Sequence, residues 1–90
     1  MLNPDGVACG NYRADPLGCN LNRVYGQATI ARHPTIFAAR AAILQIHARR
    51  QLAIYVDAHA HAGKRGCFLY GNRDPQDTRA DGPLFAHLAA

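Results

Sequence analysis

Two histidines with metal-binding chemistry, His59 and His61, follow a short apolar run near the middle of the chain. The apolar run 52–57 predicts a buried strand, and ligands in open α/β sheets bind beyond the carboxyl ends of strands. Neutral imidazole is a common zinc ligand, and residues two apart on an extended backbone face the same side. The pattern indicates either a metal site that includes His59, or a polar strand end with one solvated and one hydrogen-bonded histidine.

A second group of polar residues lies in a glycine-rich loop earlier in the chain. Arg13 ends the run 10–13, and the pair Asn22 and Arg23 ends the run 20–23. An arginine binds a carboxylate through two parallel hydrogen bonds, and an asparagine amide adds a directional donor. The loop therefore has the side chains to hold a substrate carboxylate. The alternative is a loop whose asparagines serve turns and whose arginines face solvent.

Further basic residues, Lys64 and Arg65, come directly after the histidines. They form either a solvated turn or a positive patch that attracts an acidic substrate. We interpret the remaining three histidines as a helix-entry residue and two surface residues, namely His33, His47 and His87.

The positions of apolar and turn-forming residues predict an α/β architecture. In chain order the expected elements are a long loop over 1–31, a helix over 34–50, a strand over 52–57, a turn over 62–66, a second strand over 67–70, a polar loop over 72–82 and a helix from Pro83 onward. The first helix has proline at its first position and basic residues in its last turn. Its predicted apolar face comprises Phe37, Ala41, Leu44 and Ala48, flanked by Ile36 and Ile43.

Composition restricts the class of protein further. Ninety residues allow one small domain, and the net charge of +4 favours acidic partners. The three cysteines form no CxxC pair, which favours free thiols in a reducing compartment. The first residues resemble no signal peptide, and no apolar run is long enough to span a membrane. These features together predict a cytoplasmic protein with no membrane partner.

Five short motifs occur in an order and spacing that resemble a known family. They are the runs 3–6, 11–13, 21–23, 33–36 and 57–61. In this respect the chain is similar to the M14 zinc metallocarboxypeptidases, specifically the cytosolic carboxypeptidases that remove glutamates from tubulin. The run 56–72 looks most like the subtype five group, the branch-point deglutamylases. The resemblance extends over nearly the whole chain up to Asn72.

The resemblance implies a fold, a cofactor and a set of roles. The chain would be the central fragment, residues 1–90, of a catalytic domain, with part of a mixed sheet and flanking helices. The cofactor would be Zn²⁺, and the partners would be glutamylated protein tails such as those of tubulin. Matching motif positions assign His59 as a zinc ligand, Asn22 and Arg23 as the substrate-carboxylate pair, and Arg13 as the catalytic oxyanion-stabilising residue. Lys64 and Arg65 become candidate contacts to a glutamate side chain. His61 is expected to lie beside the zinc ligands or to face the substrate, without binding zinc itself.

The chain departs from the family pattern in two ways. Ala58 and Ala60 replace a larger apolar residue and a glycine around His59. More seriously, the sequence contains no glutamate, whereas the family's HxxE motif and its general base each require one. We therefore expect those residues to lie outside this sequence, and the chain alone to be inactive.

Two other classes of function fit parts of the sequence. An amidohydrolase-type enzyme also uses an Asp-x-His-x-His-like segment, but normally near the start of its domain, and it leaves the arginine motifs unexplained. A small basic binding module would cluster arginines beside aromatic platforms. The arginines here are scattered and the aromatic residues occupy mainly apolar positions, so we do not expect a nucleic-acid partner.

Overall fold

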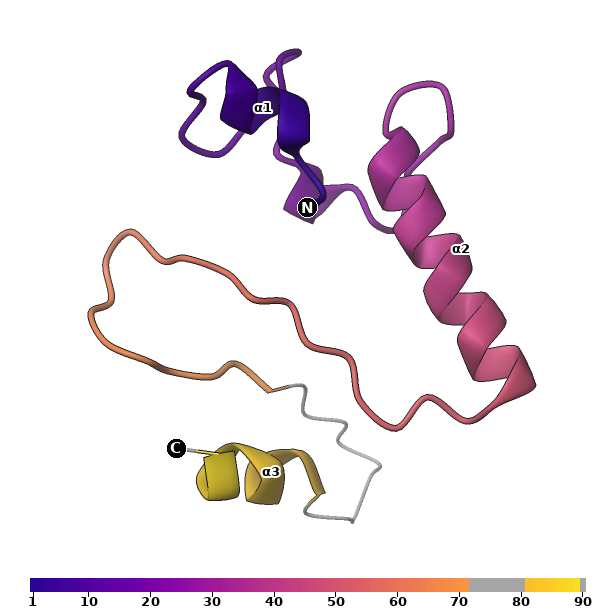
Figure 1. Ribbon diagram of the computed structural model, residues 1–90, viewed down its shortest axis with the longest axis vertical. Helices are drawn as coiled ribbons and strands as arrows, with labels where there is room; N and C mark the ends of the chain where they lie inside the picture. Colours follow the sequence, from indigo (N-terminus) through magenta and orange to yellow (C-terminus); the bar gives the residue numbers. More distant parts are fainter. Residues whose placement is uncertain (72–80, 90) are drawn as a thin grey trace. The chain divides into compact units, whose positions relative to one another are not determined.

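The computed structural model describes residues 1–71 and 81–89. Four helical elements occur in it: α1 (Pro4–Ala8), the 3₁₀ helix η1 (Leu21–Arg23), α2 (Pro34–Arg49) and α3 (Asp81–Ala89) (Figure 1). The chain divides into two compact units, Met1–Val56 and Asp57–Ala90.

Helix α1 is short and is fixed at its start by an asparagine. The side chain of Asn3 accepts a hydrogen bond from the backbone nitrogen of Gly6 at 3.1 Å, and Pro4 occupies the first turn. The same side chain donates through Nδ2 to the carbonyl oxygen of Ala14 at 3.1 Å. A Cβ atom on Gly6 would collide with the Asn3 side chain and lie 2.6 Å from that carbonyl oxygen. Glycine is required here because the following loop packs directly on α1.

Helix α2 confirms the predicted helix and ends one residue before its predicted end. It begins at Pro34, after His33 as the N-cap residue, which confirms the helix-entry interpretation. The predicted centre of the buried face is wrong. Phe37 and Leu44, which were predicted to lie at that centre, are 39% and 56% exposed, whereas Ile36, predicted at its edge, is 1% exposed. The covered face of α2 is therefore centred on Ile36.

The core of the first unit explains this choice of face. Ile36 packs with Val24 and Ala28, and partly buried residues surround these three: Leu2, Cys19, Leu21 and Tyr25. The hydroxyl of Thr35 also donates to the carbonyl oxygen of Leu2 at 2.7 Å. The predicted loop over 1–31, which contains only the short elements α1 and η1, is thus held against the first turn of α2.

The predicted mixed sheet with flanking helices is wrong for the part of the chain that the structure describes. Neither 52–57 nor 67–70 forms a strand there. A strand needs a neighbour to satisfy its backbone hydrogen bonds, and no described segment pairs with either run. The burial that both predictions assumed is missing as well, since Val56 is 65% exposed and Leu69 is 50% exposed.

The second unit confirms two smaller predictions. Bends occur within 62–66, where Gly66 has a φ of +79°, a left-handed conformation that favours glycine. Helix α3 confirms the predicted C-terminal helix and begins two residues before Pro83. The predicted loop over 72–82 lies largely outside the described residues. Among the helices that the structure describes, none has the length and apolar character needed to cross a membrane.

Candidate functional site

The six residues predicted from the sequence are divided equally between the two units. The first unit holds Arg13, Asn22 and Arg23, and the second holds His59, Lys64 and Arg65.

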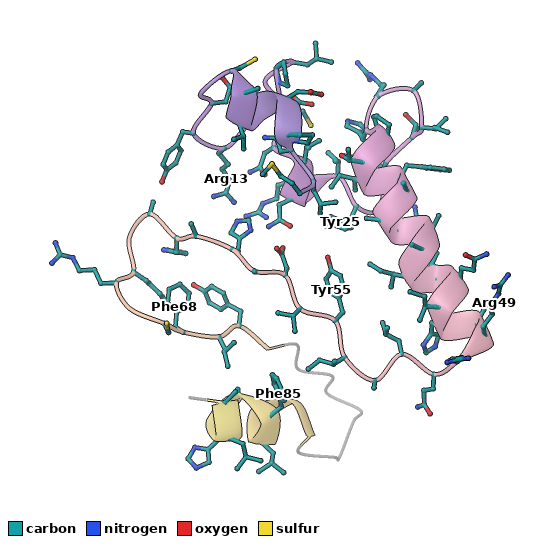
Figure 2. All side chains as sticks on the ribbon, viewed as in Figure 1. Arg13, Tyr25, Arg49, Tyr55, Phe68 and Phe85 are labelled. Carbon is teal, nitrogen blue, oxygen red and sulfur yellow. The ribbon has the colours of Figure 1, made fainter. Side chains whose placement is uncertain are left out.

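Arg13 lies in the loop that follows α1, and its side chain is exposed (Figure 2). The loop around it is fixed by Asn11, whose Nδ2 atom donates to the carbonyl oxygens of Ala14 at 3.2 Å and Asp15 at 3.1 Å. The Arg13 guanidinium itself makes no hydrogen bond or ion pair within residues 1–71 and 81–89. A cation on a fixed backbone with free donors is suited to binding an anionic oxygen.

Asp15 closes the loop between Arg13 and the second arginine segment. This carboxylate is 9% exposed. Its Oδ1 atom accepts hydrogen bonds from the backbone nitrogens of Leu17 at 3.0 Å and Cys19 at 2.7 Å. The backbone nitrogen of Asp15 also donates to the carbonyl oxygen of Cys19 at 2.9 Å. Residues 15–19 therefore form a closed turn that connects the two candidate substrate-binding segments.

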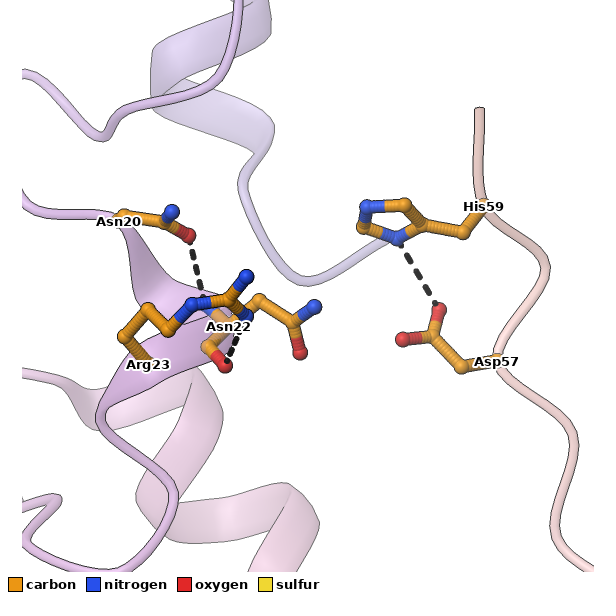
Figure 3. A network of polar contacts seen from close by, with 5 residues as sticks. All are labelled: Asn20, Asn22, Arg23, Asp57 and His59. Carbon is orange, nitrogen blue, oxygen red and sulfur yellow. Dashed lines mark hydrogen bonds and ion pairs between the residues drawn. The ribbon is translucent and has the colours of Figure 1, made fainter. Parts of the chain in front are cut away.

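Asn22 and Arg23 lie on η1, and both are exposed. Asn20 caps this 3₁₀ helix, because its Oδ1 atom accepts from the backbone nitrogen of Asn22 at 3.2 Å (Figure 3). The Nη1 atom of Arg23 donates to the carbonyl oxygen of Asn22 at 3.2 Å. This bond uses one of the five guanidinium N–H donors, and the others have no partner within the part of the chain that the structure describes.

Two residues that form turns hold the segments on which these arginines lie, and the predicted alternative, in which asparagines of the loop serve turns, is confirmed for Asn20. Asn20 and Asp15 both accept from the backbone nitrogen two residues later. This spacing is the Asx turn, which asparagine and aspartate form readily. The Asx residue at the start of each turn is the sequence signal for it, and the run 15–18 has turn-forming residues of this kind.

His59 lies beside an aspartate in the second unit. Its Nδ1 atom is 3.6 Å from Oδ1 of Asp57, with the side chains 49% and 40% exposed (Figure 3). Metal-binding histidines commonly direct one ring nitrogen toward a carboxylate and bind the metal with the other. At 3.6 Å this contact is longer than a hydrogen bond, so the half-exposed ring of His59 can still serve as a metal ligand.

His61 has a different environment. Its Nδ1 atom accepts hydrogen bonds from the backbone nitrogens of Gly63 and Lys64, both at 3.1 Å. Its ring packs edge-on against Phe68 with the ring centroids 5.4 Å apart. Its Nδ1 atom is therefore occupied by the following turn.

The two basic residues after His61 differ in their contacts. The Lys64 ammonium lies 4.8 Å from the ring centroid of Phe68 and 4.6 Å from that of Tyr70, which are cation–π distances. Arg65 is exposed and makes no such contact within the described part of the chain. Arg65 is accordingly the freer of the two cations to meet an acidic substrate.

The described residues provide one candidate zinc ligand and not a complete set. No group of three or more His, Cys, Asp or Glu residues among them could hold a metal ion. Structural and catalytic zinc sites use at least three protein ligands. His59 fits zinc as a single ligand whose partners would come from elsewhere.

No protein-family model matches the chain, but about 80% of it is similar in sequence to named proteins. The Caenorhabditis elegans protein named cytosolic carboxypeptidase 6 is 47% identical over 74 residues, which is 80% of this chain and 16% of that protein. The Danio rerio cytosolic carboxypeptidase 2 is 39% identical over 77 residues, 86% of this chain and 11% of that protein. The human cytosolic carboxypeptidase 2 is 42% identical over 71 residues, 79% of this chain and 8% of that protein.

The matched region covers most of this chain but only a small part of each relative. The chain spans 16%, 11% and 8% of the length of these three proteins. The resemblance inferred from the five motifs is confirmed at the level of the cytosolic carboxypeptidases. Over about 80% of its length, the chain is homologous to a segment of proteins named cytosolic carboxypeptidases.

Proposed function

We propose that the chain is a segment of a zinc-dependent carboxypeptidase that removes glutamates from protein tails such as those of tubulin. The observation that carries the proposal is the homology to cytosolic carboxypeptidases, at 47% identity in the C. elegans relative. The exposed donors of Arg13 and Arg23 support it, because a carboxypeptidase must bind the free carboxylate at the end of its substrate.

Each candidate residue has a role that its geometry supports. Arg23 and Asn22 bind the substrate's terminal carboxylate, since a guanidinium fork matches a carboxylate bidentately. Arg13 lies on a fixed loop with no partner for its guanidinium among the described residues, and it stabilises the negative charge that develops on the scissile carbonyl oxygen in the transition state. The preorganised backbone around Arg13 is important because a donor already in place costs no reorganisation during the reaction.

His59 would hold a bound zinc ion as one of its ligands. When bound, zinc lowers the pKa of a water molecule toward neutrality and polarises a carbonyl group. The remaining ligands and the general base come from residues beyond this sequence, which contains no glutamate. We accordingly expect the isolated 90-residue chain to be inactive.

Glutamate specificity is the finer part of the proposal. The net charge of +4 favours an acidic substrate, and Arg65, close to His59 in sequence, has no ion pair among residues 1–71 and 81–89. A glutamate side chain entering a partly desolvated pocket needs a positive partner, because an unpaired buried carboxylate is costly. The relatives carry "cytosolic" in their names, which supports a cytoplasmic location. The preference for branch-point glutamates remains a prediction.

The test is hydrolysis of a peptide that ends in several glutamates by the complete protein that contains this chain. The proposal predicts release of free glutamate, loss of activity after treatment with a chelator, and recovery on adding Zn²⁺. Internal cleavage, or glutamate release that a chelator does not affect, would exclude a zinc carboxypeptidase. Hydrolysis of a small cyclic amide in place of the peptide would favour the amidohydrolase alternative.

A further inference from the structure

A pocket of about 390 Å³ lies within the first unit. Its walls come from the Asp15–Cys19 turn, from the segment that follows η1 and from the residues just before α2. None of the six candidate site residues lines it, so the proposed function gives it no role. Its volume falls at the small end of the range for small-molecule sites, roughly 300–1,000 Å³. The pocket is therefore suited to a ligand smaller than a peptide.

Two groups of opposite charge line this pocket without pairing with each other. The Asp15 side chain is 9% exposed, and its hydrogen bonds from Leu17 and Cys19 both end on Oδ1. Its Oδ2 atom has no hydrogen bond or ion pair within residues 1–71 and 81–89. The guanidinium of Arg32 likewise has no partner in that part of the chain. The pocket thus offers one unpaired anionic acceptor and one unpaired cationic donor.

Local hydrogen bonds fix the backbone that carries both groups. Asp15 is held by its own turn, and Thr29 holds the other segment. The backbone nitrogen of Arg32 donates to Oγ1 of Thr29 at 3.3 Å, and that of His33 donates to the Thr29 carbonyl oxygen at 2.8 Å. His33 also lines the pocket, and its buried Nδ1 atom has no hydrogen-bond partner among the described residues. A fixed backbone reduces the entropy that a ligand loses on binding.

We propose that this pocket binds a free α-amino acid with an apolar side chain. The ammonium group of the ligand donates to Oδ2 of Asp15, and its carboxylate accepts from the Arg32 guanidinium, both as charge-assisted hydrogen bonds. The side chain lies against the apolar part of the wall, which includes Leu17 and Val24. A purely anionic ligand would meet the like charge of Asp15, and a purely cationic one that of Arg32, and such contacts are costly. A zwitterion satisfies both groups.

Titration of the ¹⁵N-labelled 90-residue chain with L-leucine tests the proposal. The amide signals of 15–19 and 29–33 should shift and saturate, and those of α3 should stay in place. N-acetyl-L-leucine lacks the ammonium group and L-leucinamide lacks the carboxylate. Each should bind at least about 10-fold more weakly, because one charged hydrogen bond is lost. A chelator should change none of these results, since binding needs neither zinc nor hydrolysis.

Two substitutions test the two charges separately. Arg32→Gln, at an exposed residue, should weaken L-leucine binding by about 10- to 100-fold. Asp15→Asn keeps an acceptor oxygen for the turn but removes the charge, and it should weaken binding by a similar factor. The matched control is Arg49→Gln, at an exposed residue of α2, which should bind L-leucine as tightly as the unsubstituted chain.

The absence of saturable shifts with L-leucine would overturn the proposal. Equal binding of L-leucine and its two analogues, or unchanged binding in Arg32→Gln, would overturn it as well. Tighter binding of L-glutamate than of L-leucine would contradict the role of the apolar wall. If the chain binds L-leucine as described and the complete protein releases no glutamate, the proposed function fails and this site stands.

Discussion

The Oδ1 atom of Asp15 accepts a hydrogen bond from the backbone nitrogen of Cys19 at 2.7 Å. This contact closes the turn between Arg13 and the η1 segment that carries Arg23. A buried carboxylate therefore fixes the path of the backbone between the two arginines, and it need not contact a substrate to do so.

Replacing Asp15 with alanine should loosen this turn. The substitution leaves the backbone nitrogens of Leu17 and Cys19 without their acceptor in two partly buried hydrogen bonds, and the loss of one such bond costs about 0.5–1.5 kcal/mol. Amide hydrogen exchange in the 90-residue chain should show faster exchange at both positions. Asp15→Asn keeps an acceptor oxygen and should have a smaller effect. Unchanged exchange at Cys19 in the alanine variant would show that the carboxylate does not hold the turn.

Gly6→Ala should destabilise the first unit. The added Cβ would lie 2.6 Å from the carbonyl oxygen of Ala14, and overpacking of this kind costs about 1–3 kcal/mol. The matched control is Gly26→Ala, where the added Cβ meets nothing within 4 Å. Thermal melting followed by circular dichroism should show a lower midpoint for the first variant and an equal or higher one for the second. Equal midpoints for both variants would contradict the close packing of α1 on the loop.

Local sequence signals predicted α2 and α3, placed α1 and η1 within a predicted loop, and predicted a sheet wrongly. Pro34 and the basic last turn of α2 act within the helix itself, so the sequence alone located its ends to within one residue. The runs 52–57 and 67–70 predicted strands from apolar content, but a strand depends on a partner that local sequence does not specify. The exposed faces of Ile54, at 52%, and Tyr55, at 51%, show that no described segment covers the first run.

For the candidate site, too, the sequence predicted the types of side chain present but not the contacts that depend on how the chain folds. Residue types and spacing predicted which side chains carry charge and which could bind metal. They did not predict that Lys64 contacts Phe68 and Tyr70, because that contact depends on how the chain reverses at Gly66. They also did not predict that Oδ1 of Asp57 lies 3.6 Å from Nδ1 of His59, since a carboxylate two residues before a histidine is common and only the geometry brings the two together.

The two candidate arginines should affect different kinetic constants in the complete protein. Arg13→Ala should lower kcat by roughly 100- to 1,000-fold, as expected for a donor that stabilises the oxyanion. Arg23→Ala should mainly raise KM, because the terminal carboxylate is bound equally in the ground state and the transition state. Arg23→Lys should recover only part of the loss, since lysine lacks the bidentate fork. A raised KM with unchanged kcat for Arg13→Ala would contradict its catalytic role.

Glutamate preference should depend more on Arg65 than on Lys64. Arg65 has no partner within the described residues, whereas the Lys64 ammonium lies over two aromatic rings. In matched peptides that end in glutamate or leucine, Arg65→Gln should reduce the ratio of kcat/KM values more than Lys64→Gln does. Arg49→Gln, at an exposed residue of α2, should leave the ratio unchanged.

Raising the salt concentration should also lower the glutamate preference, because exposed charges are screened. An unaltered ratio in Arg65→Gln would remove Arg65 from the specificity site. A preference of the unsubstituted protein for leucine would exclude deglutamylation and leave the zinc carboxypeptidase proposal standing.

The most direct test of the account is the zinc content of the complete protein, measured together with glutamate release, before and after His59→Ala. The matched control is His87→Ala, at an exposed histidine of α3. We predict one zinc ion per chain and full activity in the unsubstituted protein and the control, and loss of both zinc and glutamate release in His59→Ala. Retention of one zinc ion per chain in His59→Ala would contradict the assignment of His59 as a ligand and the site built on it.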